Sequence, residues 1–126
     1  MATSPMKQYA RSQVDALFNR LVKTLHRAAQ KQDEEAVHQM RVSIRRFDQC
    51  LTVFEQFVPE RASKKLRKHL RRVMRLSSKV RDLDIAISFL KKQRFPAGNL
   101  AEKRERARLD LAGALEWSPN EAKLAG

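Results

Sequence analysis

The 126-residue sequence is poor in the residues that form disulfides, tight turns and aromatic surfaces. Its single cysteine, Cys50, excludes an internal disulfide and a cysteine-pair metal site, and a reducing compartment is the simplest interpretation. Only three glycines and four prolines occur, in a chain dominated by Ala, Leu, Arg, Lys, Gln and Glu. This composition favours helices over sheets. Aromatic residues make up 6% of the chain and are not interleaved with the basic residues as in proteins that stack on single-stranded nucleic acid.

Long apolar segments are also absent. No apolar run approaches the ~20 residues that a helix needs to span a bilayer. Residues 1–12 lack the apolar stretch of a signal peptide. These absences predict a cytoplasmic protein without membrane insertion.

Acidic residues are too few to balance the basic ones. Twenty-seven Lys and Arg against fourteen Asp and Glu give a formal net charge of +13. A charge this far from zero predicts a polyanionic partner, which could be nucleic acid, an anionic membrane surface or a phosphate polymer. Charge alone does not distinguish among these partners.

Apolar residues recur at spacings of three and four, which predicts amphipathic helices. The first helix is expected to start at Ser4, an N-cap residue with Pro5 at the first helical position, and to end near Gln32. The second helix is expected to start after Asp33 and to run along the most regular apolar seam in the chain until Pro59 ends it.

A third helix is expected over residues 61–93, with the polar pair Ser77–Ser78 bending or loosening it. A turn at 95–99 separates it from a fourth, weaker helix over 100–117. The expected buried side of the third helix is Leu66, Leu70, Val73, Val80, Leu83, Ile87 and Leu90. The expected apolar contacts of the fourth helix are Leu109, Leu111 and Leu115.

Four amphipathic helices with short connections predict an all-α fold, an antiparallel four-helix bundle with long helices and a basic face or groove. No linker long enough to separate two domains occurs. We therefore expect a single domain over residues 1–117, followed by a C-terminal tail at 118–126.

Residues 37–46, VHQMRVSIRR, place basic side chains beside the apolar seam of the second helix. At about 100° per residue, His38, Arg41 and Arg45 form one strip that flanks the seam, whereas Arg46 points farther away. A strip in this position can line a groove between two helices.

Residues 61–81 of the third helix contain ten Lys or Arg and no acidic residue. Like charges at helical spacing weaken an isolated helix, and a sequence that needed only solubility would interleave acids. We therefore expect this basic face to be the partner of the strip on the second helix. The residues that step by three and four along it are Lys65, Lys68, Arg72, Arg75 and Lys79.

Arginine forks match two phosphate oxygens, lysine adds a flexible point charge, and a protonated histidine adds a donor. Rigid helices would spread these groups over a long track. Such a track suits a linear polyanion better than a single small phosphate.

Three segments together resemble the CHAD domain, the conserved histidine α-helical domain. They are HQMRVSIRRF at 38–47, the basic third helix, and VRDLDIAISFL at 80–90, within a matching core of residues 34–91. The resemblance implies an all-helical fold whose basic cavity binds inorganic polyphosphate. By position it assigns to that site His38, Arg41, Arg45, Arg46, Lys65, Lys68, Arg72 and Arg81. The basic face adds Arg75 and Lys79.

Members of this family usually contain two such helical halves, and this chain has one histidine–arginine motif. It is therefore a fragment, a half-length member, or a protomer that pairs with a copy of itself. A homodimer is one expected arrangement.

Binding is expected to be non-catalytic and to need no cofactor. The sequence has no glycine-rich phosphate loop, no paired carboxylates for two metals and no nucleophile with a base. A metal site at His38 with Asp82 or Asp84 is disfavoured, because no second His or Cys lies at a ligand spacing. Instead, the two aspartates are expected to hold arginines or to cap a helix bend.

Two alternatives remain open. The same basic faces could bind nucleic acid, or they could meet an acidic protein partner in a mainly structural role. If the ligand is polyphosphate, association with polyphosphate granules is one expected location.

Overall fold

The computed structural model describes residues 4–116, and within that range it contains only helices and the turns between them. This confirms the expected all-α fold. The tail expected at 118–126, and Trp117 at the expected end of the fourth helix, lie outside the described residues. The elements are α1 Pro5–Gln30, α2 Glu34–Val53, the short 3₁₀ helix η1 Glu55–Phe57, α3 Glu60–Lys92 and α4 Leu100–Leu115.

The first two helices start where the sequence predicts, because each has a side chain that caps its N-terminus. The Ser4 hydroxyl accepts a hydrogen bond from the backbone N–H of Lys7 at 3.1 Å, and Pro5 follows in the first turn. Asp33 Oδ1 accepts from the backbone N–H of Ala36 at 2.7 Å. Each cap satisfies a donor that the first helical turn leaves without a partner.

The second helix ends earlier than its apolar seam suggests, so that prediction was wrong. α2 stops at Val53, which is 70% exposed, and the chain turns through η1 before Pro59. Val58 is extended, with φ −121° and ψ 138°, as expected for a residue that precedes proline. Phe54 and Val58 still pack against the core from this turn. The apolar spacing therefore continues beyond the helix.

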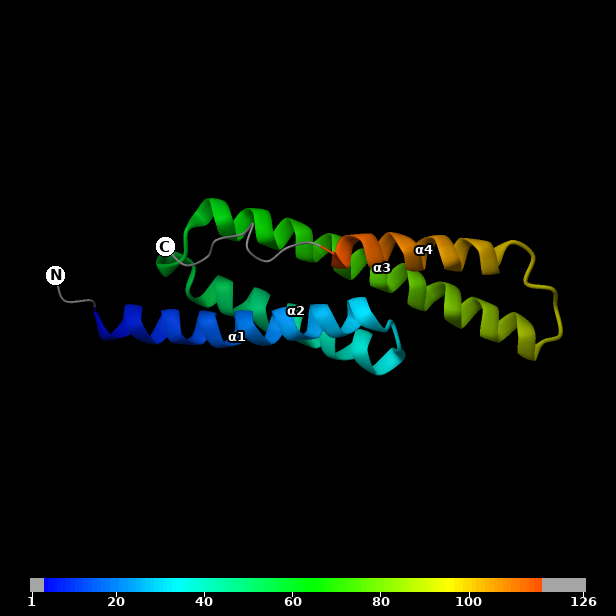
Figure 1. Cartoon of the computed structure of the whole chain (residues 1–126), viewed down its shortest axis with the longest axis horizontal. Helices are drawn as coiled ribbons and strands as arrows, with labels where there is room; N and C mark the ends of the chain where they lie inside the picture. The colour runs from blue at the N-terminus through cyan, green and yellow to red at the C-terminus, as the bar shows by residue number, and fades with distance from the viewer. Residues whose placement is uncertain (1–3, 117–126) are drawn as a thin grey trace.

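The helices form two antiparallel hairpins that pack together, which confirms the predicted four-helix bundle. α1 packs mainly against α2 and α3 mainly against α4, and the two hairpins lie side by side (Figure 1). The core lies where all four helices overlap. Its largest fully buried apolar side chains are Leu21, Met40, Phe47, Leu51, Leu66, Val73 and Leu111.

The α3–α4 hairpin extends well beyond the α1–α2 turn (Figure 1). Gln32, in that turn, donates from Nε2 to the carbonyl of Arg108 at 3.0 Å, so the turn lies against the middle of α4. We call residues 60–78 the inner half of α3 and residues 79–92 its outer half. The buried residues of α3 all belong to the inner half.

Several apolar residues expected to be buried are therefore only partly covered. In the outer half, Val80, Leu83, Ile87 and Leu90 are half-buried. On α4, Leu111 and Leu115 are buried as expected, whereas Leu109 is 55% exposed, which corrects that prediction. Among residues 4–116, no helix combines the length and apolar character that crossing a membrane requires.

Candidate functional site

Arg41 connects α2 to α3 at the centre of the predicted site. Its half-buried side chain donates from Nη1 to the Met74 carbonyl at 3.1 Å, to Ser77 Oγ at 2.6 Å and to Ser78 Oγ at 2.9 Å. This contact explains the polar pair in α3. The helix continues unbroken through the pair, and Ser77 is only 1% exposed. The two serine hydroxyls accept hydrogen bonds from Arg41, and they do not break the helix.

Positive charge is concentrated around Arg41. Burial lowers the pKa of Arg41 from its ordinary value, the nearby cations Arg45 and Arg81 lower it further, and Asp82 raises it. Arginine remains protonated at neutral pH even when its pKa falls, so the repulsion of Arg41 by Arg45 and Arg81 persists. A bound anion would relieve that repulsion.

A second contact sets the register of α2 against α3. Arg67 donates from Nη2 to the Asp48 carbonyl at 2.9 Å and to Thr52 Oγ1 at 2.6 Å, and its Nε lies 3.1 Å from Asp48 Oδ1. Together with the Arg41 contact, it shows that the two helices run antiparallel. The contacting lines are Arg41, Asp48 and Thr52 on α2, and Arg67, Met74 and Ser78 on α3.

Basic residues flank these contact lines on the solvent side. At about 100° per residue, His38 and Arg45 lie beside the α2 line, on the side away from the core. Arg71 and Arg75 lie beside the α3 line in the same sense. Arg45 and Arg71 fall between the levels of the two contacts, and Arg75 lies at the level of the Arg41 contact, between Met74 and Ser77. We call this solvent-facing seam between α2 and α3 the outer groove.

A shallow hollow of about 380 Å³ opens on α3 next to the outer groove. We call it the α3 hollow. Its only histidine, His69, has its ring Nε2 at 3.0 Å from the Ala114 carbonyl of α4. The hollow is lined by Lys65, Lys68, His69, Arg71, Arg72 and Arg75.

Arg71 and His69 line the α3 hollow but are not among the site residues predicted from the sequence. The pattern of three-and-four spacing selects a single line on the helix, and Arg71 lies one residue before a member of that line, Arg72. The available signal was the acid-free run itself, since a helix without acids is basic on more than one side.

The other predicted residues divide into those that join these groups and those that do not. Lys79 is exposed and continues the line of Lys65 along α3. Arg81 lies about 200° around α3 from Lys79, and its charge acts on Arg41. Arg46 is exposed and lies about 140° around α2 from Arg41, so it points away from the contact with α3. The structure thus brings together Arg41, Arg45 and Arg81 in one group, and Lys65, Lys68, Arg72 and Arg75 in another.

A family model of the CHAD domain matches residues 7–123. The chain belongs to the CHAD domain family. The match extends on both sides of residues 34–91, from which the resemblance in the sequence was drawn. No curated protein and no solved structure matched the chain.

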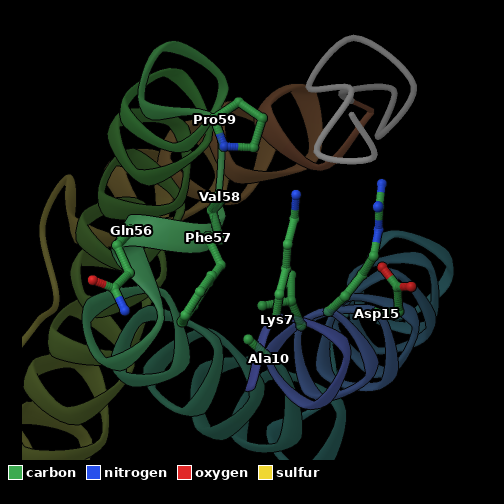
Figure 2. Close-up of a pocket in the computed structure, with 9 residues that line it drawn as sticks. Lys7, Ala10, Asp15, Gln56, Phe57, Val58 and Pro59 are labelled. Atoms are coloured by element: carbon green, nitrogen blue, oxygen red, sulfur yellow. The ribbon is translucent and has the colours of Figure 1, made fainter. Parts of the chain in front are cut away.

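This CHAD domain has a second and larger hollow, of about 460 Å³, between the N-terminal part of α1 and the segment of η1, Val58 and Pro59 that precedes α3 (Figure 2). In Figure 2, Lys7 and Asp15 extend from α1 on one side, and Val58 and Pro59 lie across from them. Its charged lining is mixed, with Asp15 beside Lys7 and Arg11, and it contains no predicted site residue. The α3 hollow, which has no acidic lining, fits a polyanion better.

The acidic residues of the CHAD domain near the site hold arginines. Arg104 Nε donates to Asp84 Oδ1 at 2.6 Å, which confirms that prediction for Asp84. Asp82 acts on Arg41 through its charge. Within residues 4–116, no group of three or more His, Cys, Asp or Glu side chains is placed to hold a metal ion.

Proposed function

We propose that this CHAD domain binds inorganic polyphosphate without transforming it, along the outer groove and the α3 hollow. The observation that carries the proposal is the concentration of cations at the α2–α3 seam. Arg45 and Arg81 each repel Arg41 there, beside a hollow lined by five Lys or Arg. Membership of the CHAD family supports the same ligand.

The arrangement suits a linear polyanion for two physical reasons. Helices fix the spacing of the backbone positions from which the cations project, so the backbone part of the ordering cost is met on folding, before the ligand arrives. The row also carries repulsion in the free protein, which a chain of phosphates relieves along its whole length. Binding should therefore strengthen with polyphosphate length until the ligand spans the groove and the hollow.

The residues have different roles in this proposal. Arg41 is committed to α3 through Nη1, so it holds the seam together and adds a fixed charge. Arg45 is exposed in the outer groove and is free to turn its guanidinium to phosphate oxygens. Arg72 and Arg75 offer the same geometry from the α3 hollow, and His38 adds a donor at the edge of the groove.

The test is a titration of the chain with polyphosphates of defined length, against duplex DNA of matched charge, at physiological salt. The variant Arg45→Gln/Arg75→Gln removes one cation from each wall of the outer groove. Because each lost phosphate contact reduces the magnitude of the negative slope of log affinity against log salt by ~0.7, the double variant should reduce that magnitude by about 1.4. Its far-ultraviolet circular dichroism should be unchanged, since Arg45 and Arg75 are exposed.

A matched control keeps the change in net charge constant. Lys103→Gln/Arg106→Gln removes two exposed cations from α4, away from the groove, and should change the affinity little. An equal loss in this control would mean that binding depends on net charge alone. Competition by duplex DNA at matched charge would favour nucleic acid as the ligand, and shortening of the polyphosphate during incubation would contradict a non-catalytic role.

A further inference from the structure

The outer half of α3 carries an exposed face with a particular order of residues. Asp82, Ile85, Phe89 and Lys92 follow one another at spacings of three, four and three, so they share one side of the helix. Ile85 is 58% exposed and Phe89 is 60% exposed. Asp82 and Lys92 are exposed at the two ends of the face.

This face continues the line along which α3 contacts α2. Ser78, which accepts a hydrogen bond from Arg41, precedes Asp82 by four residues and lies on the same side of the helix. Up to Ser78, the line is covered by α2. Beyond it, the α3–α4 hairpin projects past the α1–α2 turn (Figure 1), and the line is exposed. Two large apolar side chains on adjacent turns form a patch and are not isolated surface residues.

The order of residues along the face is complementary to the same order read in reverse. It reads acid, apolar, apolar, cation. If a second copy lies antiparallel, with a two-fold axis midway between Ile85 and Phe89, each Ile85 faces the Phe89 of the other copy and each Asp82 faces its Lys92. Every side chain of the face then meets a complementary one, and the two-fold axis repeats both contacts. A parallel pairing would instead place like charges together.

We propose that this face is a homodimer contact, in which two copies of the chain pair antiparallel through Asp82, Ile85, Phe89 and Lys92. A chain of net charge +13 resists self-association. The face overcomes this because its own charges balance, with one acid and one cation around an apolar centre. The pairing does not depend on the proposed ligand, so it is measured in the absence of any polyanion.

Sedimentation equilibrium of the unmodified chain should show a monomer–dimer equilibrium. Phe89→Ser should abolish the dimer without reducing helicity, because the side chain is already mostly exposed. Asp82→Lys places two pairs of lysines opposite each other across the axis, and Lys92→Asp places two pairs of aspartates. Each single variant should weaken the dimer by about tenfold or more.

The decisive measurement restores the pairs of opposite charge, either by mixing the two single variants or by combining both substitutions in one chain. An equimolar mixture of Asp82→Lys and Lys92→Asp chains should form heterodimers, since every lysine then faces an aspartate. The double variant Asp82→Lys/Lys92→Asp should form homodimers for the same reason. No general effect of net charge predicts both recoveries.

Two controls match the charge changes away from the face. Lys91→Asp lies next to Lys92 but about 100° around the helix, and Asp110→Lys is exposed on α4; both should dimerise as the unmodified chain does. A chain that stays monomeric over the micromolar range would overturn the proposal. So would a dimer that survives Phe89→Ser, or single-charge variants that do not recover on mixing.

Discussion

The inner and outer halves of α3 have similar apolar spacing but very different surroundings. In the inner half, the apolar residues at this spacing are fully buried in the core cluster that residues of all four helices form. Past the α1–α2 turn, α4 is the helix that accompanies the outer half of α3 (Figure 1), and the corresponding residues are half-buried. The comparison shows that spacing identifies the side of a helix that can be buried. The lengths of the neighbouring helices decide whether it is.

The charge also changes along α3, close to the boundary between its halves. Residues 61–81 contain no acid, whereas Asp82 and Asp84 follow immediately. The acid-free part borders the outer groove and contains the α3 hollow. The part with acids carries the Asp84–Arg104 ion pair and the self-complementary face. The surface that attracts polyanions and the surface that can pair with its own copy thus follow one another along one helix and meet at Arg81 and Asp82.

The largest expected difference in stability comes from comparing a leucine-to-alanine substitution in the inner half with one in the outer half. Leu66→Ala should lower the free energy of unfolding by about 2–5 kcal/mol, because Leu66 is fully buried and the deletion leaves a cavity. Leu90→Ala should cost about 1 kcal/mol or less, because water already reaches that side chain. Urea unfolding at low protein concentration measures both. Equal losses would mean that the outer half is as well packed as the inner half.

A smaller effect is expected at the boundary between the halves, where Arg41 reaches Ser77 and Ser78. Arg41→Leu should cost about 1–3 kcal/mol, because it removes hydrogen bonds from a charged donor to half-buried and buried acceptors. Arg45→Leu, one turn away on the same strip, should change the stability by about 0.5 kcal/mol or less, since Arg45 is exposed. Thermal unfolding compares the two variants. A greater loss from Arg45→Leu would contradict the assigned roles.

The smallest effect is expected at the ion pair that joins α3 and α4 in the outer half. Both side chains of Asp84 and Arg104 are partly exposed, at 49% and 36%. The pair should contribute about 1 kcal/mol or less, and the contribution should fall at high salt. A double-mutant cycle with Asp84→Asn and Arg104→Gln, at low and high salt, measures the coupling. Strong coupling that salt does not weaken would show that the outer half is held more tightly than its exposure indicates.

Much of the fold could be predicted because its signals are local. The caps at Ser4 and Asp33, and the apolar spacing of α1 and α3, depend on residues within one or two helical turns. The end of α2 could not be predicted in the same way. Phe54 and Val58 keep the helical spacing while they pack from a turn, so their pattern does not distinguish the two conformations.

The candidate site could be predicted in composition but not in arrangement. The strip of His38 and Arg45 and the acid-free α3 are visible in the sequence. That Arg41 is committed to two serines, and that Arg71 lines the hollow, depends on how α2 and α3 are set against each other. The sequence alone does not distinguish a basic residue that contacts another helix from one that faces solvent.

The amino-acid sequence by itself determined the helices, their caps, the charge of α3 and the membership of the CHAD family, because each of these depends on neighbouring residues or on their order. The tertiary structure alone decided where α2 stops covering α3, which cations share a groove, and which apolar side chains remain exposed. These properties depend on contacts between residues far apart in the chain, such as Arg41 and Ser77, which are separated by 36 positions. Local spacing contains no information about such a register. It is set by the lengths of the helices and by the packing of the side chains between them.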